Sequence, residues 1–94
     1  MKIEGIIWLR EIVDKLANKH QVEPQEVEEI FDDDPTFRFV EKGEIKGEDL
    51  YVVLGQTKSG RYLITLFIFK KSKDIIIVSS RTMEKKERIL YGKR

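Results

Sequence analysis

Two neighbouring residues, Lys19 and His20, are the first in this sequence whose side chains suit acid–base chemistry. His20 is the only histidine, and histidine is the side chain that titrates near neutral pH without a shift. It could therefore act as a general base or a general acid. The alternative, which we favour for a lone histidine at the end of a helix, is a charged imidazole beside that helix's exposed carbonyls. Lys19 is more often a solvated cation.

Arg81 could bind an anion because of its expected place between a strand and a helix. It follows the β-branched run 75–78, and a short helix is expected over 82–91. The N-terminus of a helix offers backbone N–H donors to an anion. Arg61, at the start of the neighbouring strand, could lie in the same region, and two arginines on one phosphate would stabilise a doubly charged transition state. The alternative, of equal weight, is an ion pair from Arg81 to Glu84 or Glu87.

Tyr91 is the aromatic candidate at the end of the chain. Its ring could stack on a nucleobase, and its hydroxyl could donate a proton. The favoured alternative is an aromatic residue that caps the core. Within the basic part of the chain, Lys58, Lys85 and Arg88 are the residues expected to contact a polyanion, although Arg88 also suits a structural or rim charge.

Charge is unevenly distributed along the chain. Residues 23–34 include seven acidic side chains and no basic one, whereas residues 51–94 carry eleven basic and three acidic side chains. The basic segment suggests contact with a polyanion or an acidic partner. The acidic segment is interpreted more simply as a solvated surface.

Composition excludes several classes of protein. Ninety-four residues, of which 40% are hydrophobic and 37% charged, predict one domain with one core. One histidine and no cysteine cannot build an ordinary zinc site, and the run Asp32–Asp34 lacks the spacing of a calcium loop, so no metal or cofactor is expected. The sequence shows no apolar run of membrane-spanning length and no signal-peptide pattern, which predicts a cytoplasmic protein without a membrane partner.

The elements that would position these residues predict the α+β class. We expect a mostly antiparallel meander of about four strands, with two helices before it and one after it, and a weak initial segment that is either an edge strand or the lead-in to the first helix. The expected segments are 3–8 (weak), helices 8–20, 24–34 and 82–91, and strands 36–41, 50–54, 62–69 and 75–78. The second helix should begin with Glu23 as N-cap, Pro24 in the first turn and Glu26 reaching back to the cap.

The order and spacing of several short motifs resemble those of BrnT-type toxins. The resemblance spans nearly the whole chain, and no single motif carries it. The matching residues are Trp8, Lys19-His20-Gln21-Val22, Glu26-Val27, Ile30-Phe31-Asp32, Gly47-Glu48, Gly55, Gly60-Arg61-Tyr62-Leu63, Ile77-Val78-Ser79-Ser80-Arg81, Glu87-Arg88 and Tyr91.

This resemblance implies a RelE-like fold over residues 1–94 and the function of a toxin in a type II toxin–antitoxin system. The implied activity is metal-independent RNA cleavage that inhibits translation, and the implied partner is a BrnA-type ribbon-helix-helix antitoxin, through which DNA is contacted only indirectly. By resemblance, Lys19 and His20 are candidates for base or acid, Arg61 and Arg81 for phosphate contact, and Tyr91 for base stacking.

Apolar residues stand at four positions where the family pattern carries charged ones. Leu50 and Ile76 occupy positions of arginine, Leu9 of aspartate and Ile12 of lysine. Two other functions therefore stay open. One is a catalytically degenerate homologue that binds its antitoxin as an interaction or co-repressor module, and the other is a basic RNA-binding domain.

Overall fold

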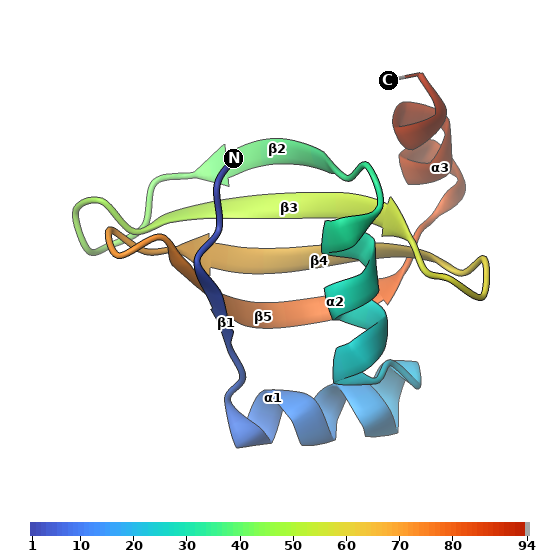
Figure 1. Ribbon diagram of the computed structural model, residues 1–94, viewed down its shortest axis with the longest axis horizontal. Coiled ribbons are helices and arrows are strands. Elements are labelled where there is room, and N and C mark those ends of the chain that lie inside the picture. Colours follow the sequence, from blue (N-terminus) through green and yellow to red (C-terminus); the bar gives the residue numbers. More distant parts are fainter. Residues whose placement is uncertain (94) are drawn as a thin grey trace.

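A computed structural model describes residues 1–93 as a single mixed sheet with helices on both of its faces (Figure 1). The elements follow one another as β1 (Gly5–Ile7), α1 (Arg10–Lys15), the π-helical turn η1 (Leu16–His20), α2 (Pro24–Asp32), β2 (Thr36–Glu41), β3 (Asp49–Gln56), β4 (Tyr62–Phe69), β5 (Asp74–Thr82) and α3 (Lys85–Gly92). The expected α+β class and the expected order of elements are confirmed.

The sheet has five strands in the order β1-β5-β4-β3-β2, not about four, and it is not wholly antiparallel. Strands β2 to β5 form the expected antiparallel meander, whereas β1 pairs in parallel with β5. Strand β1 has only three residues, and it pairs with a strand nearly seventy residues later in the sequence, with Ile6 opposite Ile75. A pairing between such distant segments depends on tertiary packing, which local pattern does not reveal.

The last strand is also longer than expected. Ser79, Ser80 and Arg81 do not join the strand to the helix but belong to β5, and α3 begins only at Lys85. The hydroxyls of Ser80 and Thr65 lie 2.8 Å apart in the interior, so each satisfies the other and the serine can stay in a buried strand.

The main core lies between the sheet and the N-terminal helices. Its fully buried members come from η1, α2 and strands β3 to β5: Leu16, Val22, Val27, Ile30, Val53, Leu63, Phe67, Ile75 and Ile77. Helix α2 approaches β3 so closely that a Cβ on Gly55 would lie 2.7 Å from the Cβ of Ile30. The start of α2 is as expected, because the N–H of Glu23 donates to the Glu26 carboxylate at 3.0 Å.

Helix α3 covers one end of the opposite face. Met83 and Tyr91 pack there on Leu54, with Val52, Tyr62 and Ile64 around them. The two faces are distinguished by strand alternation, since Leu63 and Phe67 of β4 point to α2 while Tyr62 and Ile64 point to α3.

Candidate nucleic-acid interface

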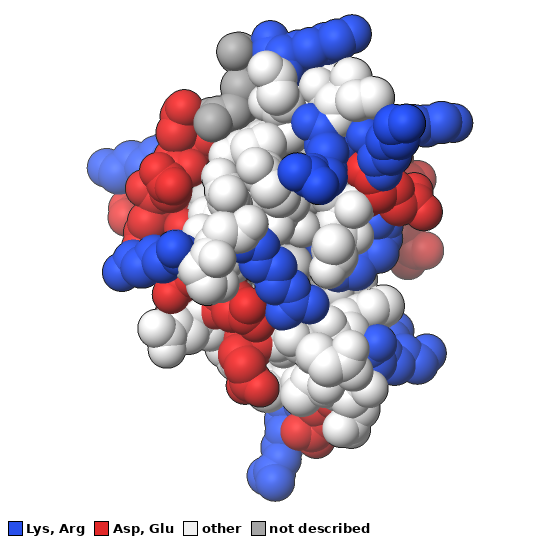
Figure 2. Space-filling model, turned by 90° about the vertical axis from the view of Figure 1, so that its right-hand side faces the viewer, with Lys and Arg blue, Asp and Glu red and all other residues white. Residues whose placement is uncertain are grey.

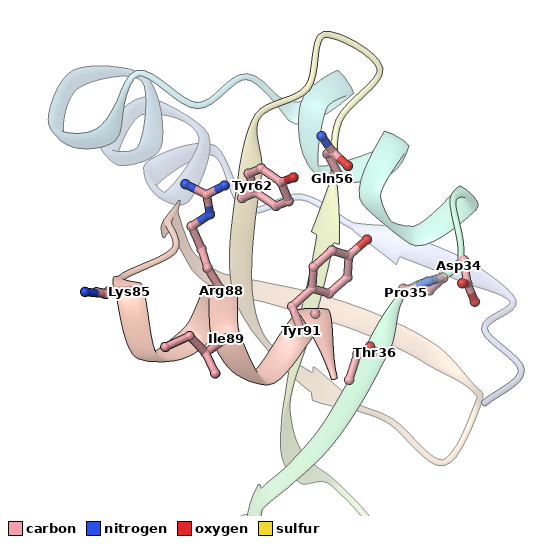
Figure 3. Close-up of a pocket in the computed structure, with 10 residues that line it drawn as sticks. Asp34, Pro35, Thr36, Gln56, Tyr62, Lys85, Arg88, Ile89 and Tyr91 are labelled. Carbon is pink, nitrogen blue, oxygen red and sulfur yellow. The ribbon is translucent and has the colours of Figure 1, made fainter. Parts of the chain in front are cut away.

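A groove with a cationic and aromatic lining lies between α3 and the start of β2 (Figure 3). Its volume is about 760 Å³, and its lining comes from the α2–β2 connection, the ends of β3 and β4, and α3. The guanidinium carbon of Arg88 lies 4.1 Å from the ring centroid of Tyr62, which is within the range of a cation–π contact. The ring of Tyr91 meets that of Tyr62 edge to face, with centroids 6.0 Å apart.

The remaining lining combines polar and apolar groups with one further cation, Lys85, and one carboxylate, Asp34. Gln56 lies at the end of β3 above the two tyrosines, Ile89 lies on α3, and Lys85 lies at the outer edge of the groove (Figure 3). Viewed from this end of the molecule, Lys and Arg side chains gather in the upper part, where α3 lies, and alternate with Asp and Glu lower down (Figure 2). The groove therefore offers flat stacking surfaces next to positive charge, which is the combination that single-stranded nucleic acid needs.

Arg61 lies on the other face of the sheet and closes the end of η1. Its guanidinium donates to the backbone carbonyls of Gln21 at 2.6 Å and His20 at 2.8 Å. It also pairs with both carboxylate oxygens of Glu26, at 3.1 and 3.2 Å. The backbone at Gln21 is left-handed (φ 52°), so the chain turns sharply here and leaves its carbonyls to a side-chain donor.

Arg81 joins β5 to α3 through a two-bond ion pair. Its guanidinium donates to the two carboxylate oxygens of Glu87 at 2.7 and 2.8 Å, and to the carbonyl of Thr82 at 3.2 Å. The hydrogen bond from Arg81 lowers the pKa of the Glu87 carboxyl, and the same bond raises the pKa of Arg81. For Arg81, the sequence left open an anion site or an ion pair with Glu84 or Glu87. The structure contains the ion pair, with Glu87 as the partner.

The candidate residues share one end of the sheet but not one face. Arg61 and Arg81 do not converge, because the first is bound to η1 and α2 and the second to α3. The backbone nevertheless links the two faces, because Arg61 binds the carbonyl of His20 and the next residue, Tyr62, contacts Arg88 and Tyr91.

The other candidates have different degrees of exposure. His20 is half-buried, and Lys19 is exposed beside it at the end of η1. Lys58 is exposed in the β3–β4 hairpin, where its N–H donates to Glu29 at 3.1 Å. Tyr91 is only 6% exposed and forms part of the second core.

Two lining residues, Tyr62 and Gln56, were not among the sequence candidates. Tyr62 directly follows Arg61 at the start of β4, and strand alternation sends neighbouring side chains to opposite faces. The alternation itself can be seen in the sequence. It identifies Tyr62 as a lining residue only once the position of α3 on that face is known. Gln56 carried no comparable signal.

Three of the apolar residues on the α3 face form one row across the sheet. Leu50 pairs with Ile68, and Ile68 pairs with Ile76, so Leu50 and Ile76 flank one isoleucine. All three side chains are half-buried. The row lies toward the other end of the strands from the groove.

Among residues 1–93, no three or more His, Cys, Asp and Glu side chains are arranged to hold a metal ion. Within the same residues, no helix is long and apolar enough to cross a membrane.

A family model described as ribonuclease toxin, BrnT, of type II toxin-antitoxin system matches residues 10–87. No curated protein matches the chain.

Proposed function

Because that match covers most of the chain, the protein belongs to the BrnT family of type II toxin–antitoxin ribonuclease toxins, and on this premise we propose that it cleaves single-stranded RNA bound in the groove between α3 and the sheet. The observation that carries the proposal is the cation–π pair of Arg88 and Tyr62 beside Tyr91, in which the guanidinium carbon lies 4.1 Å from the ring centroid. The proposed site of action is the cytoplasm, where cleavage of messenger RNA inhibits translation.

RNA binding uses the flat groups of the groove. A nucleobase stacks on the outer face of the Arg88 guanidinium, whose inner face already lies against Tyr62. Lys85 at the outer edge and the charge of Arg88 neutralise backbone phosphates. The strand then continues across this end of the sheet, past the β3–β4 hairpin with Lys58, toward Lys19 and His20.

The proposed reaction needs no metal. The ribose 2′-oxygen loses its proton to a base and attacks the adjacent phosphorus, the bond from phosphorus to the 5′-oxygen breaks, and the leaving 5′-oxygen takes up a proton. The products are a 2′,3′-cyclic phosphate and a 5′-hydroxyl. In this scheme His20 acts as the base or the acid, and Lys19 beside it stabilises the extra negative charge of the transition state, while Arg88 holds the strand in the groove.

We assign Arg61 and Arg81 positioning roles, because each is already bound to a carboxylate. Arg61 holds the end of η1 and thereby the place of His20, and Arg81 holds α3 and thereby the place of Arg88. Tyr91 supports the ring of Tyr62. From the sequence, both arginines were candidates for direct contact with phosphate. The positioning roles instead predict that loss of either arginine lowers the stability of the fold as well as the activity.

A cleavage assay on labelled single-stranded RNA in the presence of EDTA tests this function. We expect Arg88→Ala to weaken RNA binding about tenfold, as loss of one stacking group does, and His20→Ala to lower the cleavage rate about a hundredfold. Lys86→Ala is the matched control, since Lys86 is exposed on α3 but does not line the groove. Absence of cleavage by the wild-type chain, or cleavage that EDTA abolishes, contradicts the proposal.

The apolar row Leu50, Ile68 and Ile76 supports a second candidate, a catalytically silent module that acts by binding its antitoxin. The resemblance implies arginine at positions 50 and 76, and the leucine and isoleucine that stand there cannot bind a phosphate. Expression of the chain alone in a host cell separates the candidates. Growth arrest supports the ribonuclease, whereas no arrest with the wild type and arrest with Leu50→Arg plus Ile76→Arg supports the silent module.

We also propose that the antitoxin is a ribbon-helix-helix protein of the BrnA type and that any effect on DNA passes through it. The family implies an antitoxin partner but not its fold. A small reading frame of that type beside the gene, whose product relieves growth arrest, supports this assignment. A neighbouring antitoxin of another fold contradicts it.

A further inference from the structure

A second hollow, on the opposite face of the sheet from α3, has the reverse charge of the groove. Its volume is about 670 Å³, and it lies between the N-terminal segment, the end of α2 and the edge strand β2. Figure 1 shows the N-terminal segment and α2 on the same side of the sheet. Its floor is apolar, with Ile3 beside Phe31 and Phe37. The rings of Phe31 and Phe37 lie 6.0 Å apart, and both contact the fully buried ring of Phe67 at 5.6 and 6.2 Å.

The rim of this hollow is acidic. Glu4, Glu28 and Asp32 line it together with Met1, and none of its lining side chains within the described part of the chain is Lys or Arg. Lys73, whose carbonyl accepts a hydrogen bond from the N–H of Glu4 at 2.8 Å, lies outside the lining. The rim continues into the acidic segment 23–34, which carries seven carboxylates and no cation.

We propose that this hollow docks a basic segment of the partner antitoxin, with one apolar or aromatic side chain seated on Phe31 and Phe37 and lysines or arginines facing Glu4 and Asp32. The inference rests on the proposed function only in that the chain is half of a toxin–antitoxin pair, and not on RNA cleavage. Charge complementarity selects the occupant, because RNA is repelled by the rim and a basic polypeptide is attracted to it. The aromatic floor suits both an apolar anchor and a cation above a ring.

The position of the hollow gives docking a consequence. Pro35 lines both the hollow and the RNA groove, with Asp32 on one side of it and Asp34 on the other. A protein anchored in the hollow therefore lies next to the groove and can reach over Pro35 to cover it. This arrangement lets an antitoxin recognise the acidic side of the toxin and obstruct its cationic side.

Titration of the isotope-labelled full chain with a capped peptide, followed by NMR, tests the proposal. The probe has one Phe flanked on both sides by Lys and Arg. Two matched peptides replace the Phe by Ser, or the basic flanks by Glu. We expect shifts of Ile3, Phe31 and Phe37 with the first peptide, and about tenfold weaker binding of each control peptide.

The charge-reversed variant Glu4→Lys with Asp32→Lys should lower affinity for the basic peptide about tenfold. Neither side chain is close-packed, since both are exposed, so the fold is retained. Glu41→Lys with Glu44→Lys makes the same change of net charge at exposed sites outside the hollow and should bind the peptide unchanged. RNA cleavage by these variants reports separately on the proposed ribonuclease activity.

Shifts confined to the α3 groove, equal effects of the two double variants, or no shift at millimolar peptide overturn the docking site. None of these results bears on RNA cleavage, which the assay on labelled RNA decides independently.

Discussion

Arg61 offers the sharpest test of the structural reasoning, because its guanidinium holds together three segments. It donates to two backbone carbonyls at the end of η1 and pairs with Glu26 at the start of α2, while its own backbone precedes β4. The Arg61 and Glu26 side chains are 28% and 23% exposed, so the pair is partly shielded from water. We expect Arg61→Ala to loosen the junction of η1 and α2 before it affects the rest of the sheet.

The magnitude follows from the contacts that are lost. Hydrogen bonds that involve a charged group contribute about 1.5–3 kcal/mol each, but the freed carbonyls at this partly exposed junction can be hydrated. The net loss should therefore be about 2 kcal/mol of unfolding free energy, which lowers the melting temperature of a domain of this size by roughly 10 °C. Arg61→Lys keeps the charge but not the planar fork, and should lose about half as much.

Thermal and urea unfolding, followed by circular dichroism, measure this loss. Arg38→Ala is the control, since Arg38 is exposed and donates to the carbonyl of its neighbour Phe37, at 2.9 Å. Its effect should be below about 0.5 kcal/mol. If the melting temperature of Arg61→Ala is unchanged and RNA binding is completely lost, the positioning role is refuted. Direct contact of Arg61 with phosphate is then the better explanation.

Three further predictions concern other parts of the fold. Since the pKa of Glu87 is lowered in the folded state, its contribution to stability is present above its ordinary pKa and is lost as pH falls through the lowered value. Urea unfolding from about pH 6 to about pH 3 should therefore show a smaller loss of unfolding free energy in Glu87→Gln than in the wild type. An equal loss in the two proteins contradicts the Arg81 pairing. Gly55→Ala should destabilise the fold by about 1–3 kcal/mol in the same unfolding assay, because the added Cβ meets Ile30 at 2.7 Å, and an unchanged stability contradicts the close approach of α2 to β3. Lys85→Ala should reduce the salt dependence of RNA binding by about one phosphate contact, measured by fluorescence anisotropy at several salt concentrations, and an unchanged slope places Lys85 outside the bound strand.

Features that depend on local chemistry were predictable from the sequence. The Glu23-Pro24 start of α2 follows from capping rules, and strands β2 to β4 follow from apolar runs between polar turns. Pro35 indicated that α2 stops nearby, but the helix was expected to reach residue 34 and ends at Asp32, because proline restricts only the residue directly before it, Asp34.

Features that depend on distant contacts were not predictable in the same way. The parallel pairing of β1 with β5 joins segments from the two ends of the chain, and nothing in three residues specifies that partner. The expected strand end at Val78 was wrong because Ser80 finds a hydroxyl partner only once β4 is beside it. Arg61 and Arg81 looked like companions in the sequence, but the alternating faces of a sheet assign them to different helices.

The most direct test of the central claim, that RNA lies in the groove between α3 and the sheet, is photo-crosslinking with a single-stranded RNA that contains 4-thiouridine. Mass spectrometry then identifies the attached residues. We expect crosslinks to Tyr62 and to the exposed side chains of the Lys85–Gly92 helix, which become much weaker with Arg88→Ala and persist with Lys86→Ala. Crosslinks concentrated on the apolar row around Ile68, or on the acidic hollow near Phe37, would contradict it.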